Sequence, residues 1–212
     1  MEAEPPKHKR RWFQFSLRTL LILTTIVAIP CAWLGRKIEQ KRRERNAVRA
    51  IAEKFGLAQY DYEIAHQSEP SGPAWLRRLF GDNLFSEVTA VSLTGGSHDD
   101  DDLAVLDDLP NIHLLDLQDT NVTDAGLAHL SGLSELERLN LKGTPAVGNA
   151  GCRYLSGLGR LKWLDLSGTK TSELKYLKAL GSLEYLDLLD TKTDDAGVNE
   201  LRNALPNCTI YH

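Results

Sequence analysis

Residues 112–141 read IHLLDLQDTNVTDAGLAHLSGLSELERLNL, and this stretch decides the fold. It holds one full copy of a pattern, in which three apolar residues of a strand are followed by a small polar turn and a short helical stretch, and then the strand of the next copy. The strand positions are Ile112, Leu115 and Leu117 in the first copy and Leu136, Leu139 and Leu141 in the second. Repetition of a strand and a helix at this period predicts a solenoid, in which each unit buries its apolar residues against its neighbours.

The same strand pattern recurs along the C-terminal part of the chain. Units begin at Val88, Ile112, Leu136, Leu161 and Leu183, with spacings of 24, 24, 25 and 22 residues, and a partial unit begins at Cys208. Three residues after the last strand leucine, four units carry a threonine, whose hydroxyl can bond to the turn backbone. These threonines are Thr120, Thr144, Thr169 and Thr191.

The helical stretch of each unit has two positions that we expect to face the core. In the second unit they are Leu127 and Leu130, with Thr123 as the expected N-cap. The third unit has Cys152 and Leu155 in these positions, so Cys152 is interpreted as a buried apolar residue.

The repeats match the motif LxLxxTxVTDAGLxxLxxLxxL, which resembles bacterial leucine-rich-repeat proteins related to the cysteine-containing subclass. The resemblance covers residues 88–212. It implies an α/β leucine-rich-repeat solenoid, with a short curved parallel sheet and convex helices. The segments RRWFQFSLRTLLIL, YDYE and PAWLRRLFGDNLFSEV also resemble membrane-anchored members of this group, which are binding scaffolds.

Charge is divided unevenly along the chain, although the net charge is only -4. Residues 1–54 hold 13 Lys and Arg against 5 Asp and Glu, so the remainder is strongly acidic. The basic residues flank an apolar run, an arrangement that suits anionic lipid headgroups. The acidic remainder would repel a phosphate backbone, so no nucleic-acid partner is expected.

The apolar run lies between Arg18 and Arg36, and its 17 residues carry no charge. We expect a basic tail at 1–16, a transmembrane helix at 17–35 and a basic stalk helix at 36–54. Near the end of this helix, Val48, Ile51, Ala52 and Phe55 recur at i, i+3, i+4 and i+7, which predicts an amphipathic face that docks on another surface. A cleaved signal peptide and a buried core helix are the alternatives. Cleavage is disfavoured because Pro30 and other restrictive residues surround Ala28. The layout is typical of a signal anchor, which predicts a single-pass protein of the cell membrane with its repeat domain outside the cytoplasm.

Residues 55–87 precede the repeats and are rich in aromatic and apolar side chains. An open solenoid needs a cover for its first repeat, and we expect this segment to supply that N-terminal cap. An extended stretch near Tyr60–Ile64 and a helix near Ala74–Phe80 are predicted.

Motifs of catalysis, cofactor binding or metal binding do not stand out, so no catalytic residue, cofactor or metal is assigned. The run His98–Asp102 invites a metal hypothesis, because hard cations prefer clustered carboxylates. It lacks the spacing of a calcium loop and falls where a helix begins, so a solvated helix cap is the preferred interpretation.

Two columns of residues are expected on the concave face of the sheet, where equivalent positions of neighbouring strands lie about 4.8 Å apart. The simplest interpretation is that they are solvated positions. The alternative is a binding surface for a protein or peptide, basic or amphipathic, with Trp and Tyr beside carboxylates. Its candidate residues are Asp116, Arg138, Asn140, Trp163, Asp165, Tyr185 and Asp187.

Two other classes of function remain as rivals to this interaction module. The first is an envelope structural protein that forms homo-oligomers through the strand at Cys208–His212. The second is an enzyme or cation-binding protein that uses the column of Asp116, Asn140, Asp165 and Asp187. It is disfavoured because no nucleophile paired with a general base stands out.

The uncharged run generates a prediction for the full-length protein. We expect it to stay in the membrane fraction after an alkaline wash, because an apolar helix flanked by basic residues resists extraction. Membrane sedimentation and immunoblotting measure this. Recovery of a soluble chain that starts after residue 31 would instead indicate cleavage.

Overall fold

The computed structural model describes residues 17–54, 56–64, 70 and 74–212. The chain divides into two compact units, residues 1–39 and residues 40–212. The second unit is called the repeat domain below. The basic tail expected at residues 1–16 lies outside the described residues.

Helix α1 (Leu17–Glu53) begins in the first unit and ends in the repeat domain. Its part in the first unit exposes several large apolar side chains, among them Ile26, Ile29 and Trp33. Within the described residues, no helix, α1 included, has the combined length and apolar character needed to cross a membrane. This finding differs from the transmembrane helix expected at residues 17–35, an expectation that rests on an uncharged run of only 17 residues.

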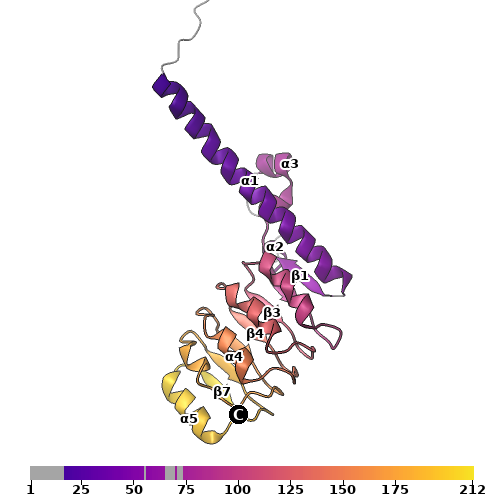
Figure 1. Cartoon of the computed structure of the whole chain (residues 1–212), viewed down its shortest axis with the longest axis vertical. Helices are drawn as coiled ribbons and strands as arrows, with labels where there is room; N and C mark the ends of the chain where they lie inside the picture. The colour runs from indigo at the N-terminus through magenta and orange to yellow at the C-terminus, as the bar shows by residue number, and fades with distance from the viewer. Residues whose placement is uncertain (1–16, 55, 65–69, 71–73) are drawn as a thin grey trace, which may run out of the picture. The chain divides into compact units, whose positions relative to one another are not determined.

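The repeat domain is built on a sheet of seven strands that follow one another in chain order (Figure 1). Strand β1 pairs antiparallel with β2, and every later pair is parallel. The strands are β1 (Leu57–Tyr60), β2 (Val88–Ser92), β3 (Leu114–Asp116), β4 (Arg138–Asn140), β5 (Trp163–Asp165), β6 (Tyr185–Asp187) and β7 (Thr209–Tyr211).

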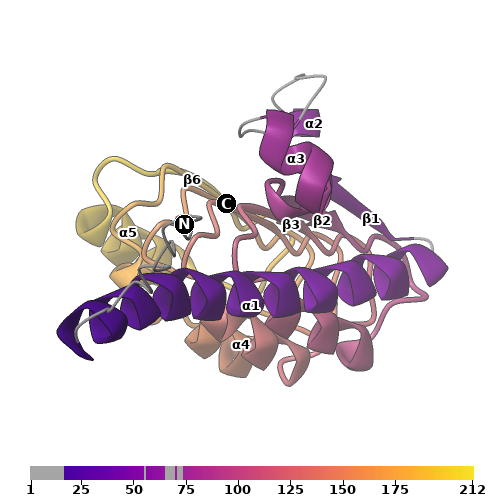
Figure 2. The same ribbon diagram turned by 90° about the horizontal axis from the view of Figure 1, so that it is seen from above.

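Short helical segments return the chain from each strand to the next. They lie to one side of the strands, as α4 does in Figure 2. Three are 3₁₀-helices, η2 (Asp100–Asp108), η3 (Gly126–Gly132) and η4 (Leu177–Ala179), and two are α-helices, α4 (Asn149–Leu155) and α5 (Asp195–Ala204). Ahead of β2 lie α2 (Asp61–Ile64), α3 (Ala74–Phe80) and η1 (Asp82–Leu84).

The core confirms the inward positions of the repeat pattern. The strand leucines of the second to fifth units are buried, and so are both helical positions of each unit, including Cys152. Burial raises the pKa of the Cys152 thiol, so this cysteine is a neutral apolar residue of the core. A single continuous core cluster joins all of the repeats.

Each strand ends in the same left-handed turn. The second residue after the last strand leucine has a positive φ in every unit, and it is Asp119 in the second unit and Gly143 in the third. One residue later, the threonine hydroxyl donates to the carbonyl of that leucine, at 2.9 Å from Thr120 and 2.7 Å from Thr169. The expected role of these threonines is thus confirmed.

Polar side chains tie each helical segment to the following repeat. The Asp100 carboxylate accepts hydrogen bonds from the amide and hydroxyl of Thr123, at 2.7 and 2.6 Å. One repeat later, Asp124 accepts from the amide of Gly148 at 2.6 Å. The run His98–Asp102 was expected to be a helix cap. Asp99 is the residue that caps η2, and Asp100 binds the neighbouring repeat.

The first repeat is covered by β1 and by the C-terminal part of α1. Ala47 and Ile51 of α1 belong to the buried core. The side chains of Lys41 and Glu44 form a buried ion pair at 2.6 Å, and Lys41 also donates to the carbonyl of Ser86, just before β2. Residues 40–53 are therefore part of the folded domain. The solvated stalk expected here is wrong for Lys41 and Glu44, which are buried, whereas the docking expected of Ile51 is confirmed.

Helix α3 lies at its predicted place but does not serve as the expected cover. Its Trp75 and Leu79 are 67% and 68% exposed, and the helix projects from the domain in both views (Figures 1 and 2). The aromatic side chains of this segment predicted that it would cover the first repeat. Ala47 and Ile51 of α1 fill that space instead.

The continuous core generates a prediction about stability. Replacing Leu139 or Leu164 by Asp should unfold the whole repeat domain. A buried carboxylate without a partner costs several kcal/mol, whereas the total free energy of unfolding of a domain is only about 5 to 15 kcal/mol. Thermal unfolding followed by circular dichroism measures this. The matched control is Leu189→Asp, since Leu189 is 47% exposed. If the core variants melted as the control does, the inward assignment would be wrong.

Candidate functional site

The strand register aligns the two predicted columns on the water-facing side of the sheet. Arg138 of β4 pairs with Trp163 of β5, and Trp163 pairs with Tyr185 of β6. The second column aligns Asp116, Asn140, Asp165 and Asp187 in the same way. All seven candidate residues therefore lie on neighbouring strands of one surface.

A row of stacked side chains occupies the first column. The rings of Trp163 and Tyr185 are nearly parallel, with centroids 5.4 Å apart and an interplanar angle of 9°. The Arg138 guanidinium covers the outer face of Trp163 at 5.0 Å, and Tyr211 packs on Tyr185 at 5.3 Å. We call Arg138, Trp163, Tyr185 and Tyr211 the aromatic row. Its ring faces are covered by neighbours, so the ring edges are left for a partner.

Tyr211 was missing from the sequence-based candidates. It lies in β7, where its backbone pairs with Asp187, so it belongs to the second column. Its ring nevertheless reaches Tyr185 and is 48% exposed. The signal that could have pointed to Tyr211 is its aromatic side chain within the partial unit that begins at Cys208.

The second column has a structural role that its sequence pattern did not reveal. Asp116, Asn140 and Asp187 each accept a hydrogen bond from the amide two residues further on, at 3.1, 3.0 and 2.9 Å. Asp165 accepts from both the amide and the hydroxyl of Ser167, at 2.8 and 2.6 Å, and is only 7% exposed. These side chains hold the turn at the end of each strand, which explains their recurrence without any ligand.

Tyr185 links the two columns. Its hydroxyl donates to Oδ2 of Asp187 at 3.3 Å. Burial raises the pKa of Tyr185, and the nearby Asp187 and Asp165 carboxylates raise it further. The phenol therefore stays protonated at neutral pH and acts as a hydrogen-bond donor.

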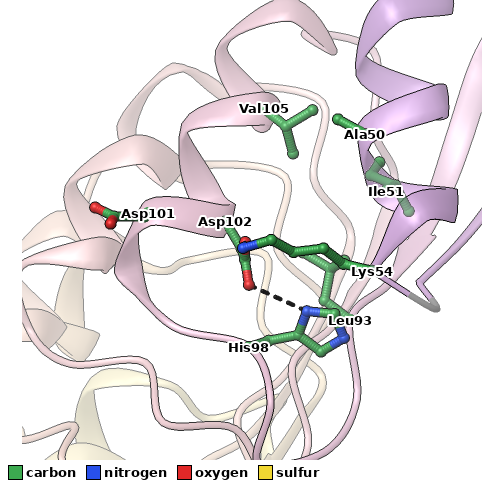
Figure 3. A pocket seen from close by; sticks show the side chains of 8 residues that line it. All are labelled: Ala50, Ile51, Lys54, Leu93, His98, Asp101, Asp102 and Val105. Atoms are coloured by element: carbon green, nitrogen blue, oxygen red, sulfur yellow. Dashed lines mark hydrogen bonds and ion pairs between the residues drawn. The ribbon is translucent and has the colours of Figure 1, made fainter.

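A second candidate lies at the first repeat, where α1 meets η2. This pocket of about 220 Å³ is lined by Lys54, His98, Asp102 and the apolar side chains around them (Figure 3). His98 is buried, and its Nδ1 lies 3.3 Å from Oδ2 of Asp102. Lys54 donates to the other oxygen, Oδ1, of the same carboxylate.

This cluster has the geometry of an anchor that ties α1 to the first repeat. Asp102 also completes a capping box with Asp99 at the start of η2. The helix cap predicted at His98–Asp102 is thus confirmed, but its expected solvation is wrong for His98 and Asp102, which are buried. Burial acts to raise the pKa of Asp102, but hydrogen bonds from Lys54, the Asp99 amide and His98 bring it below its ordinary value. Within the described part of the chain, no group of three His, Cys, Asp or Glu side chains is placed to hold a metal ion.

The sheet, the shared leucine core and the recurring turn define a leucine-rich-repeat fold. One solved structure supports this assignment. The leucine-rich-repeat ectodomain of the receptor kinase SOBIR1 from Arabidopsis thaliana aligns with a TM-score of 0.52 and 21% identity, over 80% of this chain and 90% of that chain. This likeness concerns the fold alone.

Two bacterial leucine-rich-repeat structures align over shorter stretches. An internalin from Listeria monocytogenes matches with a TM-score of 0.45 and 21% identity, over 50% of this chain. A Leptospira interrogans protein matches with a TM-score of 0.39 and 19% identity, over 51% of this chain. The alignments span only 29% and 33% of those two proteins. No protein-family model matches the sequence, and no curated protein does.

The Lys54–Asp102 anchor generates a prediction about pH. Because the pKa of Asp102 is lowered by folding, its stabilising effect is complete above the ordinary value of 3.8 and is lost as the pH falls through the folded-state value. Asp102→Asn should lower the free energy of unfolding by about 1 to 3 kcal/mol at pH 7, and by less at pH 3. Urea unfolding at both pH values measures the difference.

The matched control is Asp101→Asn, which removes the same charge from an exposed neighbour in the same pocket. Equal losses at pH 7 from both variants, or an Asp102→Asn loss that does not shrink in acid, would contradict the anchor.

Proposed function

We propose that the protein is an interaction module whose concave face binds a protein or peptide partner along the aromatic row. The observation that carries this proposal is that Trp163 and Tyr185 pack on each other above the sheet and stay partly exposed. They lie outside the buried core cluster, whose positions are filled by the leucines between them.

Physical reasons favour binding at such a row. Large aromatic side chains contribute much of the energy at protein interfaces when a partner removes them from water. The stack that runs from Arg138 to Tyr211 already restricts the rotamers of its side chains, so little side-chain entropy remains to be lost on binding. The fold and this surface support a binding role.

The second column, which holds Asp116, Asn140, Asp165 and Asp187, supports a more specific proposal. The partner is basic or amphipathic. Oδ1 of Asp165 and of Asp187 is engaged by the turn amides. Oδ2 of Asp187 takes one hydroxyl and keeps further acceptor capacity. A Lys or Arg of the partner would lie beside this oxygen, and long-range attraction would steer its approach in a salt-dependent manner.

Membrane attachment is a further part of the proposal. The exposed apolar side chains of α1 between Leu21 and Trp33, and the basic residues that flank them, support contact with lipid. We propose that this segment attaches the protein to the cell membrane, with the repeat domain outside the cytoplasm. Kinship with membrane-anchored bacterial proteins of the cysteine-containing subclass is proposed on the same basis.

Self-association is the alternative function. Strand β7 is the outermost strand of the sheet, and its Tyr211 is half exposed. An edge strand can pair with a strand of a second copy. The aromatic row favours a different partner, because most of it lies on strands β4 to β6, inside the sheet.

The proposal generates a prediction for partner capture. The double change Trp163→Ala and Tyr185→Ala should weaken binding of the native partner by about a hundredfold or more, since aromatic anchors contribute about 2 kcal/mol or more each and every 1.4 kcal/mol is about tenfold in affinity. Affinity capture from native extract, after crosslinking and quantitative mass spectrometry, measures retention at low and high salt.

The matched control is Tyr176→Ala, because Tyr176 is a partly buried tyrosine that also stacks with a cation, Lys175, but lies outside the two columns. Circular dichroism must show that both variants are folded. Equal capture by the wild type and the double variant would refute binding at the aromatic row. Capture of the same chain, with a mass that rises with concentration, would favour self-association.

A further inference from the structure

A small pocket opens on the concave face beside the aromatic row, on the side of Arg138 that faces away from Tyr185. Because the guanidinium lies over Trp163, it leaves the space above Leu114 empty. The pocket has a volume of about 100 Å³, which is room for about three water molecules or one short aliphatic side chain. Its lining is Leu114, Leu115, Asp116, Arg138, Asn140 and Trp163.

Arg138 differs from other cations that lie between neighbouring repeats. Those cations are paired, such as Arg160 with Glu135 and Lys162 with Glu137. Among the described residues, no carboxylate lies within ion-pair distance of Arg138, whose guanidinium lies over the ring of Trp163. Stacking fixes the plane of the guanidinium and leaves its edge for a planar anion.

The floor of the pocket is apolar. It is formed by Leu114, which lies next to Arg138 in the first column and is only partly buried. The neighbouring polar groups are the Asn140 amide, whose Nδ2 donates weakly to Gln118 at 3.4 Å, and the Asp116 carboxylate. The pocket thus places a cation and an amide beside an aliphatic surface.

We infer that this pocket binds a carboxylate that sits next to a short aliphatic side chain of the partner. The carboxylate would pair with the edge of the Arg138 guanidinium, and the aliphatic group would cover Leu114. The Asp116 carboxylate also lines the pocket and repels an incoming carboxylate, so binding requires that the pairing with Arg138 outweigh this repulsion. This inference rests on the proposed function and adds the chemistry of the group that the partner inserts.

Two sources supply this chemistry, a C-terminal leucine and an internal acidic residue followed by leucine. Three probes separate them. N-acetyl-leucine has the terminal carboxylate, N-acetyl-aspartyl-leucinamide has only a side-chain carboxylate, and N-acetyl-leucinamide has none. The third probe keeps the aliphatic group, so it isolates the effect of the charge.

The experiment is a titration of the full chain, ¹⁵N-labelled, with each probe, followed through the indole N–H of Trp163. We expect one of the two carboxylate probes to shift this signal, with an affinity about tenfold or more above that of N-acetyl-leucinamide. Arg138→Gln should abolish the preference for the carboxylate, while Arg138→Lys should keep part of it. The control is Arg153→Gln, because Arg153 stacks on Tyr154 at the same distance of 5.0 Å in α4.

Several outcomes would overturn the inference. Equal shifts from the neutral and charged probes would show that the carboxylate is not recognised, and an unchanged preference in Arg138→Gln would show that Arg138 is not its partner. No shift with any probe at solubility-limited concentration would also reject the pocket. Each of these outcomes can be told apart from a failure of the proposed function. If the double variant Trp163→Ala, Tyr185→Ala loses partner capture, the proposed function stands even where the inference fails.

Discussion

The burial of each leucine triplet between the triplets of neighbouring repeats is the constraint on which the rest of this structure depends. Leu139, Leu164 and Leu186 are fully buried and pair in register on successive strands. Because successive side chains of a strand alternate between faces, this register also fixes the residues between the leucines on the water-facing side. The aromatic row is aligned by the same hydrophobic contacts that fold the domain.

Turn chemistry accounts for much of the polar pattern that accompanies these leucines. The acidic column looked like a ligand site because Asp recurs at the same position of successive units. The structure shows that Asp116 and Asp187 each hold the turn that follows their own strand. A recurring polar residue in a repeat protein must therefore be tested first against the needs of the repeat, and the aromatic row is the feature that those needs do not explain.

Sequence reasoning was accurate wherever local periodicity carries the information. The strand positions, the buried Cys152, the turn threonines and the two concave columns all follow from spacing along the chain. The contact that ties α1 to the first repeat has no such period. The pair of Lys54 with Asp102 joins residues 48 positions apart, and no local pattern marks it.

The N-terminal region shows a second limit of the same kind. A stripe at Val48, Ile51, Ala52 and Phe55 predicted the docking face of a stalk helix. In the structure Ala47 and Ile51 enter the core, Ala52 is exposed, and Phe55 lies outside the described residues. Which side of a helix is buried depends on the shape of the surface that receives it, and here Glu44 and Lys41 fix the helix against the first repeat.

The left-handed turn residue bears on how such a domain can change its size. Asp119 and Asp190 occupy a position that Gly95, Gly143 and Gly168 occupy elsewhere, so one backbone shape accepts two residue types. Units of 22 to 25 residues share this turn, and their length differences fall in the helical return segments. Duplication or deletion of a whole unit would consequently join strand to strand without rebuilding either, so the domain can grow by modules while its convex side absorbs the differences in length.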